Sequence, residues 1–185
     1  QWFGYTTLGL IVFRVCWGLI GPKFSRFSQF IRGPKAVWTS VLELGQRSSA
    51  NHLGHSAIGG WATLVLLTLV TVQATSGLFI SDDIVNAGPY NSAVTQEQAD
   101  TLGWIHHTNF NVLQAFIGLH LIAILWYWIG KNHDLIKPMI SGYKDALDED
   151  GVTSSLSKRA LVTAVGATLL IIALIEFAPE PEYFF

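Results

Sequence analysis

The chain has 185 residues, of which 50% are hydrophobic and only 13% are charged, and its formal net charge is -2. With a mean hydropathy of +0.40, this composition lies outside the range of soluble domains and indicates a membrane protein. The sequence contains no phosphate-binding loop, dinucleotide fingerprint or zinc pattern, which argues against the common soluble enzymes. We expect membrane lipid, and no nucleic acid, among its partners.

Four apolar stretches are long enough to cross the ~30 Å hydrocarbon core at ~1.5 Å per residue. They are residues 2–20, 53–80, 104–130 and 160–177. The sequence therefore predicts an all-α integral membrane protein, built as a transmembrane helical bundle. Because the first span begins at once, without a charged segment or a cleavage site, we expect a preceding segment with a fifth span in the complete protein.

The charged residues separate between the loops. Every lysine and arginine except Arg14 lies in residues 21–51 or 131–159, whereas residues 81–103 contain acidic side chains and no basic ones. The positive-inside rule predicts that the two basic loops are cytoplasmic and the acidic loop periplasmic, in a bacterial inner membrane. Phenylalanine and tryptophan side chains alternate with the cations of residues 21–51, so we expect this segment to lie at the membrane surface.

Three histidines lie in the third span, in "WIHHTNFNVLQAFIGLH". His106 and His120 are 14 positions apart, so they lie within ~40° of one helix face and ~21 Å apart along the axis. His107 points to the side opposite His120. Such a separation is too long for one shared metal ion but suits two haems, each with a second imidazole from a neighbouring segment. The spacing predicts His106 and His120 as axial ligands of haem iron.

Other interpretations of these side chains stay open. A histidine in a membrane helix can simply hydrogen-bond across a helix interface, but a pair on one face favours ligation because ionisable groups are costly in lipid. His55 lies at the depth expected for His120 and is either an alternative ligand or an interfacial histidine at a helix start. Arg14 lies deep in the first span, where it either pairs with a haem propionate or extends toward the headgroups. No C-x-x-C-H motif is present, so any haem is bound non-covalently.

Several stretches resemble the bacterial cytochrome b561-like family, which includes the b-type cytochrome subunit of nickel-iron hydrogenases. They are "GYTTLGLIVFRVCWGLIGPKFSRFSQFIRGP", "LGHSAIGGW", "QATSGLFISDD", "HHTNFNVLQAFIGLH" and "LIKPMISGYK". The resemblance implies a four-helix core with two b haems, two of whose ligands match His106 and His120. The family's first helix and its second-helix histidine would precede Gln1. If they are truly absent, fewer haems are expected, with His55 as the candidate partner of His120.

The resemblance also implies an organisation and a function. Residues 1–144 form the haem-binding bundle, 145–159 a cytoplasmic linker, and 160–185 a C-terminal transmembrane helix with an outward-facing tail. The expected function is electron transfer between a quinone and a periplasmic redox protein, such as a c-type cytochrome or a hydrogenase-like subunit, within a multi-subunit oxidoreductase complex. Two alternatives are a haem-poor membrane anchor or assembly subunit, and a superoxide:quinone oxidoreductase.

Overall fold

The computed structural model describes residues 2–22, 25–43, 56–81, 87–132, 134–141 and 158–179. Four long helices dominate this part of the chain: α1 (Trp2–Ile20), α4 (Ala57–Ser76), α5 (Gln96–Leu125) and α7 (Lys158–Glu176). Each is long and apolar enough to cross a membrane, with α5 continuing through a π-helical turn at Trp126–Gly130. The prediction of an all-α membrane protein with four spans is confirmed.

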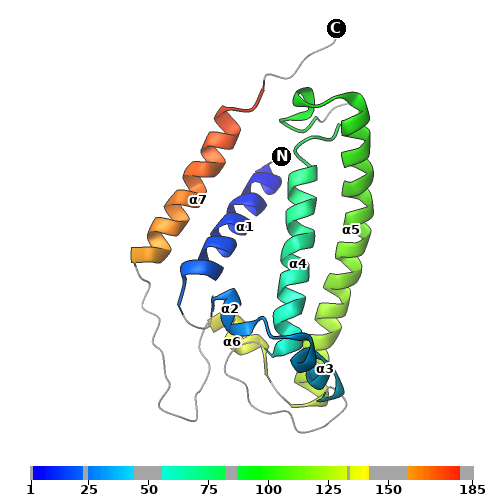
Figure 1. Cartoon of the computed structure of the whole chain (residues 1–185), viewed down its shortest axis with the longest axis vertical. Coiled ribbons are helices and arrows are strands. Elements are labelled where there is room, and N and C mark those ends of the chain that lie inside the picture. The colour runs from blue at the N-terminus through cyan, green and yellow to red at the C-terminus, as the bar shows by residue number, and fades with distance from the viewer. Residues whose placement is uncertain are drawn as a thin grey trace.

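The long helices stand side by side in the order α7, α1, α4, α5 (Figure 1). α1 packs against both α7 and α4, and α4 packs against α5. Gly9 of α1 allows a close approach to α7, because a Cβ atom there would lie 3.3 Å from the Ile171 side chain. Small residues commonly permit such contacts between membrane helices.

The two ends of the bundle differ in charge. Three short helices lie at one end: α2 (Phe27–Phe30), α3 (Pro34–Glu43) and α6 (Ile136–Ser141) (Figure 1). This end, which also includes the start of α7, carries all the described lysines and arginines except Arg14, and we call it the basic end. The opposite end contains residues 77–81 and 87–95, the start of α5 and the end of α7. We call it the acidic end, because its described charged residues are Glu97, Asp100 and Glu176.

The ends of two helices differ from the predicted spans. α4 begins at Ala57 because the Ser56 hydroxyl accepts a hydrogen bond from the Gly59 N–H, and it ends at Ser76. α5 begins at Gln96, well before residue 104, because Thr95 and Gln98 form a capping box. The first turns of α5 are polar, and hydrophobicity alone does not detect a helix that extends beyond the apolar span.

The segment after α1 lies partly inside the bundle. Phe30 of α2 is only 3% exposed and packs in the space between α1 and α4. Two glycines provide this space: a Cβ atom at Gly18 would overlap the Phe27 ring, and one at Gly60 would overlap the Phe30 carbonyl. Trp38 of α3, by contrast, is 66% exposed, and the membrane-surface position of residues 21–51 stays a prediction.

Candidate functional site

α5 turns one face toward α4, and both predicted haem ligands lie on this face. His106 and His120 are half-buried, whereas His107 is exposed. By helix rotation, His106 and His120 each lie within ~20° of Leu113, one of the buried side chains of α5. Because α5 is an uninterrupted α-helix over this length, the axial separation of the two histidines remains ~21 Å.

The imidazole of His106 is held by two side chains of α4. Its Nε2 lies 2.8 Å from Nε2 of Gln73, and its Nδ1 lies 3.0 Å from the Ser76 hydroxyl. Asn109 extends the network, since its side-chain amide donates to Gln73 Oε1 at 2.7 Å and to the Leu69 carbonyl at 2.9 Å. Both nitrogens of the ring therefore have a partner on the neighbouring helix.

The ends of this network determine which nitrogen of His106 carries the hydrogen. The single hydroxyl hydrogen of Ser76 is donated to the Val72 carbonyl at 2.6 Å, so the Ser76 oxygen accepts from His106 Nδ1–H. Gln73 uses its oxygen to accept from Asn109 and therefore presents its NH₂ to His106. The network defines the neutral Nδ1–H tautomer, whose Nε2 accepts through its lone pair from Gln73 and is the atom that a metal could bind instead.

His120 lies in a different environment. Its imidazole is half-buried and has no hydrogen-bond partner among the described residues. Since α4 and α5 are antiparallel and Asn109 contacts Leu69, His120 lies level with the first turns of α4. His55, the alternative ligand at that depth, lies outside the described residues, so its role stays a prediction.

Arg14 reaches from α1 toward α2. Its guanidinium carbon lies 5.0 Å from the centre of the Phe27 ring and 5.8 Å from that of Phe30. One N–H group donates to the Ser25 carbonyl at 3.4 Å. These contacts stabilise a cation inside a span. The Arg14 side chain extends toward the basic end, where it contacts Ser25, Phe27 and Phe30.

The profile of one protein family, described as prokaryotic cytochrome b561, matches residues 1–142. The chain belongs to the prokaryotic cytochrome b561 family. The predicted resemblance is thus confirmed, and this cytochrome is a multi-pass membrane protein of the b-type, electron-transferring class, with b-type haem as its cofactor. Comparisons with curated proteins and with solved structures gave no match.

In this b561 cytochrome, the ring nitrogens of His106 and His120 are chemically suited to bind haem iron, provided that the Gln73 amide moves away from His106. In His106, hydrogen bonding of Nδ1–H to Ser76 would leave Nε2 as the atom available to a metal, the usual arrangement of a ligating histidine. The Gln73 amide occupies that lone pair and has to move aside. No described residue hydrogen-bonds to His120 in this way. Among the described residues, no three histidine, cysteine, aspartate or glutamate side chains gather into a metal cluster.

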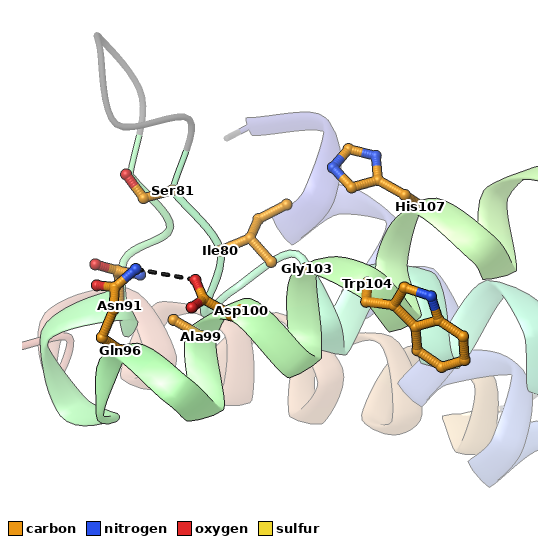
Figure 2. A pocket seen from close by; sticks show the side chains of 9 residues that line it. All are labelled: Ile80, Ser81, Asn91, Gln96, Ala99, Asp100, Gly103, Trp104 and His107. Atoms are coloured by element: carbon orange, nitrogen blue, oxygen red, sulfur yellow. Dashed lines mark hydrogen bonds between the residues drawn. The ribbon is translucent and has the colours of Figure 1, made fainter.

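His107 faces a different part of the b561 cytochrome. It lines a pocket of about 260 Å³ at the acidic end, between Ile80, Ser81 and Asn91 on one side and the first turns of α5 on the other (Figure 2). Trp104 lies beside it on α5, and a 3.0 Å hydrogen bond joins the Gln96 side chain to Asp100 nearer the start of the same helix (Figure 2). The structure thus separates the two adjacent histidines: His106 faces α4, and His107 faces the surface.

The sequence interpretation missed the polar partners of His106. Gln73 and Ser76 stand three positions apart in a predominantly apolar span, which places both side chains on one helix face. Asn109 bears the same relation to His106 on α5. Polar residues within a membrane span are themselves a signal of function, but only the pairing of α4 with α5 shows which polar residues meet.

Proposed function

We propose that this b561 cytochrome is an electron-transfer subunit that carries electrons across the membrane through two haems, one held by His106 and one by His120. Each iron takes its second imidazole from a neighbouring segment. A bis-imidazole haem has no open coordination position, so it supplies one-electron transfer and not oxygen binding. The two sites, ~21 Å apart along α5, would connect the two membrane surfaces.

The observation that carries this proposal is the placement of His106 and His120 on the α4-facing side of one continuous helix, with His107 outside it. A single helix sets the distance between the two ligands by its rise, so both haems would be held at constant separation. The protein's remaining contribution is electrostatic. We propose that Arg14 binds a haem propionate through the guanidinium N–H groups that do not donate to the Ser25 carbonyl.

We propose further that the partners are a quinone within the membrane and a periplasmic redox protein, such as a c-type cytochrome or a hydrogenase-like subunit. In this arrangement the acidic end is periplasmic and the basic end cytoplasmic, in a bacterial inner membrane. An acidic surface accelerates the encounter with a basic partner protein. Residues 1–144 would form the haem-binding bundle, 145–159 a cytoplasmic linker, and 160–185 the C-terminal helix and tail.

Haem stoichiometry in purified full-length protein tests the proposal. The wild type is expected to contain two haems per chain, with a b-type α band after reduction by dithionite. His106→Ala and His120→Ala should each lose one haem, whereas His107→Ala, the matched control, should keep both. A flat visible spectrum would show that the protein holds no haem and would favour the alternative function of a membrane anchor. Equal haem loss in all three variants would overturn the ligand assignment.

A further inference from the structure

Two side chains of α4 act on opposite edges of the His106 ring, Ser76 at Nδ1 and Gln73 at Nε2. We propose that Ser76 is a positioning residue that keeps His106 in its iron-binding tautomer and lowers the potential of its haem, and that Gln73 holds the place of the iron on Nε2. This inference rests on the proposed function, in which His106 ligates a haem.

The setting of Ser76 is suited to this role. Ser76 is 4% exposed, so neither water nor lipid competes for its hydroxyl. A Cβ atom at Gly77 would lie 3.1 Å from His106 Cε1, so the glycine next to Ser76 leaves room for the imidazole ring. The hydroxyl is also tied to its own helix through the Val72 carbonyl at 2.6 Å. Its oxygen is therefore presented to His106 in one orientation.

The chemical effect follows from the direction of the hydrogen bonds. Ser76 donates to Val72, and this polarises its oxygen and strengthens it as an acceptor for His106 Nδ1–H. A hydrogen bond at the far nitrogen makes a metal-bound imidazole a stronger electron donor. Stronger donation favours ferric over ferrous iron, so Ser76 lowers the midpoint potential of the haem that His106 holds.

Gln73 hydrogen-bonds to the other nitrogen, Nε2, and so competes with haem iron for this atom. Its NH₂ group lies on the lone pair that iron requires, while its oxygen is held by Asn109. Release of Nε2 requires movement of the Gln73 amide and leaves the Ser76 contact in place, because that contact is on the other nitrogen. Loss of Gln73 should therefore leave haem retention intact, whereas loss of Ser76 should weaken it.

The test uses the haem-loaded, full-length protein and measures two quantities for each variant: the rate of haem loss to an excess of haem-free globin, and the midpoint potential of each haem. Ser76→Ala should lose the His106 haem about tenfold faster and raise its potential by about 59 mV, the equivalent of a tenfold change for one electron. Ser76→Cys, nearly the same size but a weaker acceptor, should give an intermediate potential. Gln73→Leu should retain haem as well as the wild type.

Thr75→Ala is the matched control. The Thr75 hydroxyl bonds to its own helix at Thr71 O, 2.8 Å away, in the same way as Ser76, but it is exposed and does not contact His106. It should leave both quantities unchanged. Wild-type values in Ser76→Ala would overturn the role of Ser76, and rapid haem loss in Gln73→Leu would overturn that of Gln73. Retention of both haems in His106→Ala would instead show that the ligand assignment itself is wrong.

Discussion

The Tyr90 hydroxyl, in the loop that follows α4, donates a 2.7 Å hydrogen bond to the Leu174 carbonyl of α7. This carbonyl belongs to the last turn of α7, where the Ala178 N–H bonds to Ile175 instead. Tyr90 thus satisfies one of the carbonyls that a helix end leaves without an internal partner. The bond joins the acidic-end loop to α7, on the far side of α1.

Replacement of Tyr90 by phenylalanine should lower the free energy of unfolding by about 1 kcal/mol, the usual net contribution of one hydrogen bond. The ring would keep its contact with Phe79, whose centroid lies 6.0 Å away. Reversible unfolding in mixed detergent micelles measures the change. Thr101→Val is the control, because the exposed Thr101 hydroxyl bonds only within its own helix. Equal stability of Tyr90→Phe and the wild type would show that the loop does not anchor α7.

Addition of a methyl group at Gly60 should destabilise the protein by about 1–3 kcal/mol, the usual cost of overpacking. The new Cβ atom would overlap the Phe30 carbonyl and force α2 out of the space between α1 and α4. Gly166→Ala provides the comparison, since a Cβ atom there has no neighbour within 4 Å. Alanine at that site should be neutral or stabilising, by up to about 1 kcal/mol, because it favours the helix. The same unfolding assay should rank the two variants in this order.

Substitution of Arg14 by leucine should lower the midpoint potential of the haem at the basic end by roughly 60 mV, or tenfold for one electron. Loss of a positive charge near a propionate favours the more positive ferric haem. A redox titration followed by absorbance measures this shift. Arg26→Leu removes a charge outside the spans and should have a smaller effect. An unchanged titration in Arg14→Leu would limit Arg14 to its contacts with Ser25, Phe27 and Phe30.

Cysteine labelling should establish which end faces the periplasm. In a Cys16→Ala background, a cysteine at the exposed position Glu97 should react with a membrane-impermeant maleimide added to intact cells. A cysteine at Lys35, also exposed but at the basic end, should react only after the membrane is opened. The opposite pattern would reverse the orientation expected from the positive-inside rule.

Much of the architecture follows from local sequence signals. The first predicted span, residues 2–20, coincides with α1, because apolar length is a property of consecutive residues. The separation of His106 from His107 was also predictable, since helix rotation alone places neighbours ~100° apart. The early start of α5 was missed, although Thr95 and Gln98 have the spacing of a capping box.

The sequence by itself determined the four spans, the charge difference between the two ends, and the common face of His106 and His120, since each depends on periodicity or composition along one segment. Only the tertiary structure decided that Phe30 is buried between α1 and α4, and that Gln73 and Ser76 hold the two nitrogens of His106. These contacts join residues about thirty or more positions apart. They depend on the register and spacing of packed helices, which no single helix contains.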